Sequence, residues 1–508
     1  MKNYEIILKA AGISMIGLVF SKLVAYLITI LIAKTGSNIL GILNLGFSII
    51  SFIAMISLLG LGNGVLRYVS YYIGKKDKQR IKGTILSALK ISTIISILML
   101  ILTLIFSRYI SINIFNKPEL VNVIRIFAFI IPLIVYTEIF VNIFLSFKKI
   151  EYNVVIRDFG DKFFKLLFVI LFISLGFGIT GLAFAYLFSS IITFLLLLYF
   201  LRKKEFELFN NKIKAKFNTK EILIYSFPLI LTSLLTLLQK WADTFVIGYY
   251  RSASEIGVYS IAFSTASLLA IIPTALMSLF MPVITSLYGQ DNIKEIKRIS
   301  NSIVKWIFMT NLPFAIILSI FSKELIKIVF GPEYVNGYAS LIILSLSYLI
   351  LSITHIYASN LLMVKRTKLL SLFVLISTLI NVLLNIILIP RYGINGAAGA
   401  TLSSNLIFLI LMIVSGKFIL KLQPIKLSFI KILFAGILPA IIFFNLYKNL
   451  AANLFSLIIS ILLILIFYIL FLILFKCFSK EDANLIKKFK DKLGSKLNNI
   501  GVFFGDKE

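Results

Sequence analysis

The sequence predicts an all-α polytopic membrane protein with about fourteen transmembrane helices, arranged as two homologous six-helix lobes in parallel orientation plus two extra C-terminal helices. Three observations lead to this prediction. Hydrophobic residues make up 60% of the 508 residues, against roughly 45–50% in soluble domains, and the mean hydropathy is +1.02. Long apolar runs recur along the chain, and one phrase of the sequence occurs twice.

The apolar runs define the expected spans. Each run holds about 20 residues or more, enough for a helix to cross a hydrocarbon core of about 30 Å. The first run lacks a small-residue cleavage site, so we expect it to remain as an anchor. The expected spans are residues 9–33, 39–65, 83–107, 119–147, 152–176, 180–201, 222–248, 255–284, 299–321, 335–363, 368–390, 394–416, 427–447 and 453–476.

The repeated phrase divides these spans into lobes. "GITGLAFAYLFSS" begins at Gly178 and "GINGAAGATLSSN" begins at Gly393, 215 residues later. At nearly the same offset Gly74 matches Gly289, "NKPEL" (116–120) matches "GPEYV" (331–335), and Gly41 matches Gly257. Since six spans return the chain to its starting side, the lobes are parallel, an arrangement of transporters that bind substrate between their lobes.

The repeat and the composition together set the domain boundaries. The expected parts are a first lobe at 1–201, a cytoplasmic basic linker at 202–221, a second lobe at 222–420, two extra helices at 421–478 and a basic amphipathic tail at 479–508. We expect the tail to lie on the inner leaflet as a helix.

The net charge of +30 reflects membrane topology. Most of the 51 Lys and Arg residues fall on alternate connections between the expected spans, notably at 74–82, 202–220 and after 477. The positive-inside rule then places both termini in the cytoplasm of a multi-pass plasma membrane protein. The expected partners therefore include membrane lipids and no nucleic acid.

Several classes of chemistry lack their residues in this chain. A single Cys477 and a single His355 make a metal site improbable, and no phosphate-binding loop of the G-x-x-x-x-G-K-[ST] type occurs. Acidic residues do not gather at a membrane face, as a membrane-embedded glycosyltransferase or polymerase would need. We therefore expect no enzyme and no cofactor, with a coupling cation, Na⁺ or H⁺, as the conceivable bound ion.

Three stretches resemble a known family. They are "YSFPLILTSLLTLLQKWADTFVIGYYRSASEIGVYSIAFS" (225–264), "LIAKTGSNILGILNLGFSIISFIAMISLLGLGNGVLRYVSYY" (31–72) and "YGINGAAGATLSS" (392–404). They resemble the polysaccharide-biosynthesis, O-antigen-flippase-like branch of the multidrug/oligosaccharidyl-lipid/polysaccharide (MOP) exporter superfamily. Gly and Pro in these motifs define helix geometry more than they define cargo.

The resemblance implies a transporter of lipid-linked sugars. It implies a flippase that moves an oligosaccharide on polyprenyl phosphate or pyrophosphate from the cytoplasmic to the external leaflet by alternating access, for cell-surface polysaccharide or glycan biosynthesis. Glycan-assembly enzymes are conceivable partners, and we expect a monomer. An ion-coupled exporter of drugs or of another lipid precursor, from the same superfamily, is the alternative function.

Charges inside the spans mark candidate cargo-binding residues. Lys22 lies near the middle of the first span, about 18 Å from either end, whereas a lysine side chain reaches only about 6 Å toward an interface. It should line a cavity, or else be neutralised by a neighbouring helix. Lys240 is a second candidate in the seventh span. Arg67, at the inner end of the second span, can meet a pyrophosphate or serve as an interface anchor.

Acidic and amide residues mark candidates for cation coupling. Asp243 lies three residues after Lys240 on one helix face, so the two can pair with each other or divide between a cation and an anionic cargo. Glu138 in the fourth span can carry a proton or make an interhelical hydrogen bond. Asn381 and Asn385 place polar side chains within the eleventh span, where a cation can find oxygen ligands.

Overall fold

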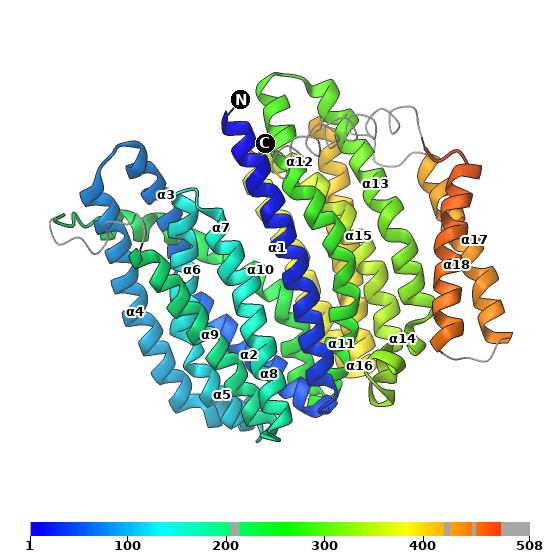
Figure 1. Ribbon diagram of the computed structural model, residues 1–508, viewed down its shortest axis with the longest axis horizontal. Helices are drawn as coiled ribbons and strands as arrows, with labels where there is room; N and C mark the ends of the chain where they lie inside the picture. Colours follow the sequence, from blue (N-terminus) through cyan, green and yellow to red (C-terminus); the bar gives the residue numbers. More distant parts are fainter. Residues whose placement is uncertain (1, 204–212, 421–426, 450–453, 479–508) are drawn as a thin grey trace, which may run out of the picture.

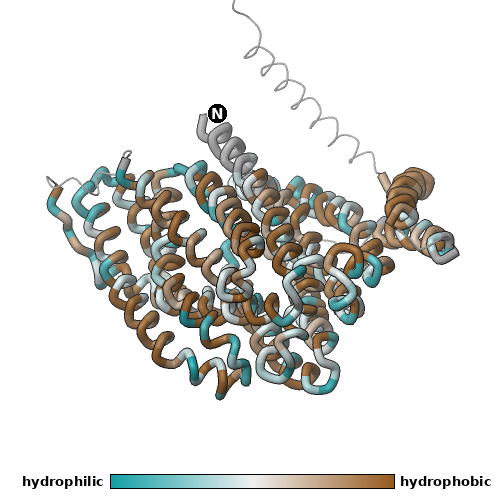
Figure 2. Tube along the Cα trace, turned by 60° about the horizontal axis from the view of Figure 1, so that its bottom comes forward, coloured by the Kyte–Doolittle hydropathy of each residue, from teal (hydrophilic) through white to brown (hydrophobic). Residues whose placement is uncertain are grey.

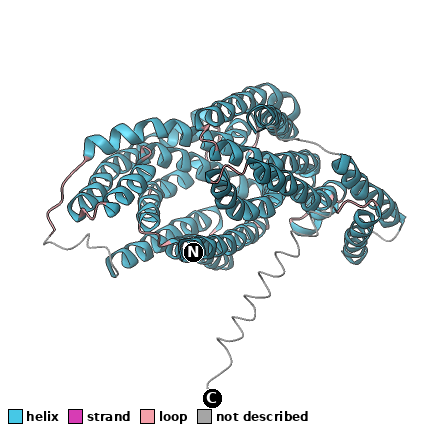
Figure 3. Ribbon diagram, turned by 90° about the horizontal axis from the view of Figure 1, so that it is seen from above, coloured by secondary structure: helices cyan, strands magenta, loops and turns pink. Residues whose placement is uncertain are grey.

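A computed structural model describes residues 2–203, 213–420, 427–449 and 454–478, and every regular element in this part of the chain is a helix (Figures 1 and 3). We call residues 2–203 the first half and residues 213–420 the second half. The helices of the first half are α1 (Lys2–Ala33), α2 (Ser37–Leu58), α3 (Leu61–Gly74), α4 (Lys78–Arg108), α5 (Leu120–Ala128), α6 (Ile130–Ser146), α7 (Ile150–Tyr152), α8 (Asp161–Ser174) and α9 (Gly178–Lys203), with π-helical segments η1 (Tyr109–Ile114) and η2 (Asn153–Gly160).

The second half also consists of helices. They are α10 (Thr219–Tyr250), α11 (Ala253–Ala266), α12 (Ile271–Gly289), α13 (Ile293–Ile320), α14 (Ser322–Val329), α15 (Tyr338–Met363) and α16 (Thr367–Leu420), with 3₁₀ segments η4 (Ser267–Ala270) and η5 (Pro332–Gly337). Two further helices follow, α17 (Leu427–Asn449) and α18 (Leu454–Leu474), which pack on each other and on α13 at one edge of the bundle (Figure 1). The expected amphipathic tail at 479–508 and residues 204–212 of the expected linker lie outside the described residues.

The helices have the surface of a membrane protein. Nine of them, among the described residues, are long and apolar enough to cross a bilayer, or ten if the bent pair α5–α6 counts as one span. Figure 2 shows hydrophobic residues along the helices and hydrophilic residues gathered at turns. One face of α4 exposes large apolar side chains that lipid would cover: Ile94, Ile97, Leu98, Ile101, Leu102 and Ile105.

Breaks in the helices change the bounds of several expected spans. The second expected span ends early at left-handed Leu59 and Gly60, and the eighth contains η4, but each still supplies one long apolar stretch (Ser37–Leu58 and Ala253–Met277). The fourth expected span is the bent pair α5–α6. The eleventh and twelfth spans form one element, α16, with Gly393 as its non-helical residue (φ 57°, ψ −138°). The number of fourteen spans therefore stays a prediction.

Left-handed backbone residues recur with the offset of the sequence repeat. Such residues are uncommon outside glycine, so their positions mark specific turns. Four pairs lie 215 to 217 residues apart: Lys76 (φ 56°) and Asp291 (55°), Asn116 (51°) and Gly331 (112°), Lys148 (59°) and Lys365 (61°), and Gly178 (58°) and Gly393 (57°). The two halves thus turn at corresponding positions of the chain.

α1 and α10 are among the helices that contact both halves. α1 packs against α8 and η2 of the first half and against α12 of the second half, and it lies between the halves in Figure 1. α10 packs against α16 of its own half and against α2 and α3 of the first half. Side chains in the middle of α1 and α10 can therefore reach the interface between the halves.

Candidate functional site

Basic side chains gather at the interface between the halves. Lys240 on α10 is exposed although it lies in the middle of a long apolar helix, and its ammonium lies 4.8 Å from the ring centre of Trp241. Lys22 of α1, Arg157 of η2 and Lys162 of α8 lie within electrostatic range of Lys240. We call Lys22, Arg157, Lys162 and Lys240 the central basic cluster.

Two members of this cluster have no acidic partner among the described residues, and two do. An Arg157 Nη1 atom lies 3.4 Å from a Glu138 carboxylate oxygen, and Lys162 Nζ lies 2.8 Å from an Asp161 oxygen. No ion pair involves Lys22 or Lys240 within the described ranges. Their ammonium groups therefore have no counter-charge among the described residues.

A small cavity lies beside Lys240. It has a volume of about 110 Å³ and is lined by Asn44 of α2, Lys240 and Trp241 of α10, and Tyr259 and Phe263 of α11, among others. We call it the central pocket. The pocket has room for several water molecules and is far too small for an oligosaccharide.

Asp243 lies inside the second half, away from the basic cluster. Its side chain is buried, and its Oδ1 accepts hydrogen bonds from Nδ2 of Asn385 (2.7 Å) and Nδ2 of Asn381 (3.4 Å). Its Oδ2 accepts from the hydroxyl groups of Thr401 (2.7 Å) and Tyr259. Within the described residues, Asp243 has hydrogen-bond donors but no basic partner. We call these five residues the Asp243 site.

The Asp243 site has the composition of a small cation site. Its side chains supply carboxylate, amide and hydroxyl oxygens, the ligands that hard cations prefer. The Oδ1 atom of Asn385 is buried and has no hydrogen-bond partner in the described structure. A buried acceptor without a partner costs free energy, and a cation bound beside Asp243 would satisfy it.

The structure brings some of the sequence-predicted residues together and leaves others apart. Asp243, Asn381 and Asn385 come together, while Lys22 and Lys240 lie at the interface. Asp243 and Lys240 do not pair with each other. Glu138 lies in the other half, bound to Arg157.

Arg67 is separate from all of these groups. Its guanidinium stacks on the ring of Tyr225 at 4.1 Å. Tyr225 precedes Lys240 by fifteen residues on α10, which is about 22 Å along a helix. Arg67 therefore lies near one end of the bundle and not in the central basic cluster.

Sequence reasoning missed residues in both groups. Thr401 and Tyr259 complete the Asp243 site, and Thr401 lies within the repeated glycine-rich phrase. Arg157 and Lys162 complete the central basic cluster. The signal was present, because the expected span 152–176 opens with a charged series that lipid would not accept: Arg157, Asp158, Asp161, Lys162 and Lys165.

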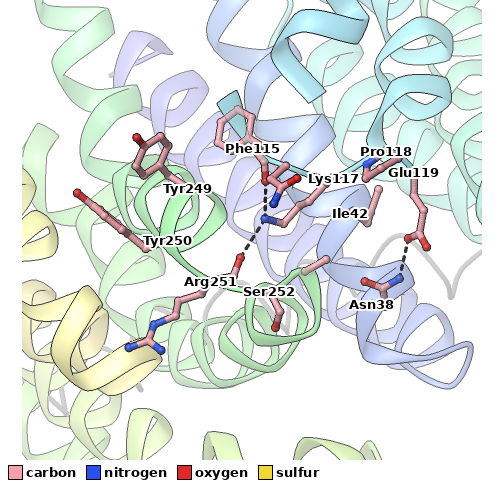
Figure 4. Close-up of a pocket in the computed structure, with 12 residues that line it drawn as sticks. Asn38, Ile42, Phe115, Lys117, Pro118, Glu119, Tyr249, Tyr250, Arg251 and Ser252 are labelled. Atoms are coloured by element: carbon pink, nitrogen blue, oxygen red, sulfur yellow. Dashed lines mark hydrogen bonds between the residues drawn. The ribbon is translucent and has the colours of Figure 1, made fainter. Parts of the chain in front are cut away.

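A buried lysine joins the halves at the end of the bundle that the charge distribution predicts to be external (Figure 4). Lys117, in the loop before α5, donates from Nζ to the carbonyl oxygens of Phe115 (3.0 Å), Gly248 (2.6 Å) and Arg251 (2.9 Å). Gly248 lies in the final turn of α10 and Arg251 is the residue that follows its end, so a lysine of one half caps a helix of the other. Burial lowers the pKa of Lys117, and the Glu255 carboxylate partly offsets this effect.

The second half returns an equivalent contact. Glu333 accepts a hydrogen bond from the backbone N–H of Ser37 (3.0 Å), the first residue of α2, and another from its hydroxyl group. The Tyr334 hydroxyl donates to the carbonyl oxygen of Ala33 at the end of α1 (2.6 Å). We call this pair of loop-to-helix contacts the reciprocal caps. They fasten the two halves together at this end.

Comparison with known proteins identifies the family. The model of a family described as polysaccharide biosynthesis protein matches residues 38–339. The chain belongs to this family. Its long apolar helices agree with a multi-pass membrane protein.

Two curated relatives are similar to the chain in sequence. The chain is 22% identical over 434 residues to the uncharacterized membrane protein MJ1068 of Methanocaldococcus jannaschii, covering 82% of this chain and 84% of that one. It is 30% identical over 185 residues to the probable low-salt glycan biosynthesis flippase Agl15 of Haloferax volcanii, covering 36% of this chain and 39% of that one.

The fold is similar to that of solved transporters. The lipid II flippase MurJ in an inward closed conformation matches with a TM-score of 0.75 at 20% identity, over 91% of this chain and 98% of that one. An inward-facing multidrug resistance MATE family transporter matches with a TM-score of 0.70 at 18% identity, over 79% and 94%.

Proposed function

We propose that this family member is a flippase that moves an oligosaccharide on a polyprenyl phosphate or pyrophosphate from the cytoplasmic to the external leaflet. The product would serve cell-surface polysaccharide or glycan biosynthesis. The observation that carries the proposal is the position of Lys22 and Lys240, two ammonium groups in the middle of apolar helices, at the interface between the halves, without an acidic partner among the described residues.

The argument is energetic. A charged residue in the centre of a membrane helix costs about 2.5–3.5 kcal/mol on insertion scales, so it needs water or a counter-charge. A phosphate or pyrophosphate group supplies the counter-charge and accepts several hydrogen bonds from ammonium groups. The prenyl tail of the cargo would remain in lipid while the head group crosses between the halves.

Crossing requires alternating access. We propose that the two halves act as parallel six-helix lobes, with both termini in the cytoplasm of the plasma membrane, and that they rock about their interface. The central pocket is too small for an oligosaccharide, so entry requires one end to open. The reciprocal caps close the end predicted to be external, and release requires them to separate. Arg67, near the opposite end, would meet the pyrophosphate first.

A cation at the Asp243 site would supply the energy. Among the described residues, Asp243 has uncharged hydrogen-bond donors and, beside it, an unsatisfied amide oxygen of Asn385. We propose Na⁺ as the coupling ion, with H⁺ as the alternative that the same assay distinguishes. A cation gradient then drives transport, because a bound cation neutralises the charge of the Asp243 carboxylate, and Asp243 lies next to α11 at the interface between the halves.

A transport assay in vesicles tests the proposal. Purified protein is reconstituted into liposomes with a fluorescent prenyl pyrophosphoryl oligosaccharide, and the fraction reaching the opposite leaflet is measured by an impermeant quencher. We expect Lys22→Gln to abolish transport and Lys22→Arg to retain part of it, since attraction survives with altered shape. Lys90→Gln, at an exposed lysine of α4 outside the cluster, is the matched control. Normal transport by Lys22→Gln would refute the proposal.

The drug-exporter alternative fits the charges less well. The interface group holds five basic residues, namely the central basic cluster with Lys165, against the acidic residues Glu138, Asp158 and Asp161. This leaves an excess of positive charge, which favours an anionic cargo over cationic drugs. Transport of an organic cation that competes with the lipid-linked sugar would favour the alternative.

A further inference from the structure

Tyr259 of α11 takes part in both groups of the proposed transporter. Its hydroxyl donates to Oδ2 of Asp243, and its side chain lines the central pocket together with Lys240 and Trp241. Tyr259 itself is 2% exposed. No other residue of the Asp243 site, within the described chain, lines the central pocket.

Resting on the function proposed above, we propose that Tyr259 is the positioning residue through which a cation at Asp243 changes the affinity of the central pocket for the phosphate-bearing cargo. The reason lies in the hydrogen bond. While the carboxylate is free of a cation, its Oδ2 lone pairs accept the Tyr259 proton. A cation at Asp243 competes for these lone pairs and repels that proton, so the hydroxyl must turn or withdraw.

A displaced hydroxyl moves the wall of the pocket. The phenol oxygen and the ring of tyrosine are one rigid group, so a shift of the oxygen carries the ring with it. Ser260, Phe263 and Ser264, on the same and the next turn of α11, also line the pocket. Cation binding inside the second half thereby changes the wall of the central pocket, which faces the cargo.

The helix that carries Tyr259 can move as a short unit. α11 has only 14 residues, bounded by the turn at Ser252 and by the 3₁₀ segment η4. A stretch of 3₁₀ helix between α-helices often marks a hinge. Gly257, two residues before Tyr259, packs directly on the backbone of α2 at Ser37, so a movement of α11 also reaches the first half.

The test measures the coupling between cation and cargo. The chain has two tryptophans, and Trp306→Phe leaves Trp241 in the pocket as the sole fluorescence reporter. The probe is a short-chain prenyl pyrophosphoryl sugar, titrated in Na⁺ and in choline at constant ionic strength, with separate pH steps in choline. Direct ²²Na⁺ binding is measured in parallel.

We expect saturating Na⁺ to change the probe affinity about 5- to 150-fold in the otherwise unchanged protein, the usual range for coupled sites. In Tyr259→Phe, which keeps the ring, the change should fall to less than about twofold while ²²Na⁺ still binds. Tyr348→Phe is the control, because Tyr348 also lies near Asp243 but does not line the pocket. It should keep the full effect.

The outcomes separate the inference from the proposed function. If neither Na⁺ nor pH changes the probe affinity of the otherwise unchanged protein, cation coupling itself is wrong and the inference falls with it. If the cation effect exists and Tyr259→Phe keeps it, the inference is overturned while the transport proposal stands. Loss of ²²Na⁺ binding in Tyr259→Phe also overturns it, since the hydroxyl would then be a cation ligand and not a link.

Discussion

Gly41 of α2 and Gly257 of α11 face each other where the two halves come into backbone contact. A Cβ atom on Gly41 would lie 1.8 Å from the carbonyl oxygen of Ala253, and one on Gly257 would lie 2.1 Å from that of Ser37. Each glycine thus packs on the first turn of the opposing helix. The two residues are 216 positions apart, so one position of the repeat meets its own equivalent across the interface.

This packing predicts that either glycine is intolerant of a methyl group. Gly41→Ala and Gly257→Ala should each lower the free energy of unfolding by about 1–3 kcal/mol, because backbone atoms would have to move. Thermal unfolding in detergent measures the effect. Gly399→Ala in α16 is the control, since its nearest neighbour is 4.0 Å away and alanine favours a helix by about 1 kcal/mol. Equal unfolding midpoints for all three variants would contradict the packing argument.

The Lys117 contact predicts how readily the external end of the protein opens. Lys117→Met keeps the aliphatic stem but leaves three carbonyl oxygens without their donor, at a cost of about 1–3 kcal/mol. We expect the external end to open more often. The readout is a Ser264→Cys reporter in the central pocket, in a Cys477→Ser background, labelled by an impermeant maleimide. Labelling should rise in Lys117→Met and stay unchanged in Lys34→Met, at an exposed lysine of the same end.

The charge distribution predicts the orientation in the membrane. In the Cys477→Ser background, Lys75→Cys between α3 and α4 should react with an impermeant maleimide in inside-out vesicles. Lys34→Cys between α1 and α2 should react in intact cells, because basic connections remain in the cytoplasm. The opposite pattern would invert the topology and with it the proposed direction of transport.

The sequence predicts the long helices better than their breaks. Apolar length defines a span, but hydropathy does not register a change of backbone direction. The left-handed pair Leu59 and Gly60 is followed by Leu61, so the apolar run continues across the break. The sequence repeat predicts the turns better than hydropathy does, because a left-handed turn needs particular residues. Gly178 and Gly393 share a left-handed backbone that glycine adopts without strain.

The sequence likewise predicts some residues of the candidate site and not others. Asp243, Asn381 and Asn385 stand out as polar residues within apolar runs, and the structure brings them together. Arg157 and Lys162 are marked only by the charged series that opens the expected span 152–176. That signal is weak, because the series follows a basic connection within about four turns, where charges at helix ends are ordinary. Arg157 lies in the π-helical segment η2, which no residue pattern predicts.

We predict that removing one partner of a buried ion pair in the first half strongly destabilises the protein. Asp161 lies 2.8 Å from the ammonium of Lys162 and 3.6 Å from that of Lys165, and the Asp161 and Lys165 side chains are 16% and 10% exposed. Removing one partner of a buried pair costs about 3–5 kcal/mol, so Asp161→Asn should clearly lower the thermal unfolding midpoint. Asp77→Asn is the control, because asparagine caps a helix as well as aspartate does. Similar midpoints for both variants would mean that the pair contributes little.

If Na⁺ binds at Asp243, we expect Na⁺ to stabilise the protein against unfolding. A ligand that binds only the folded state adds about 2.7 kcal/mol at a concentration of 100 times its Kd, so replacing choline by Na⁺ at constant ionic strength should raise the unfolding midpoint. Asp243→Asn keeps the volume of the side chain and removes its charge, so this protection should disappear. Asp291→Asn is the matched control, since Asp291 lies in a left-handed turn (φ 55°) that asparagine also favours, and it should keep the protection. If Na⁺ still protects Asp243→Asn fully, the cation binds elsewhere. If the unfolding midpoint of the unmodified protein responds to neither Na⁺ nor pH, Asp243 is excluded as the coupling site.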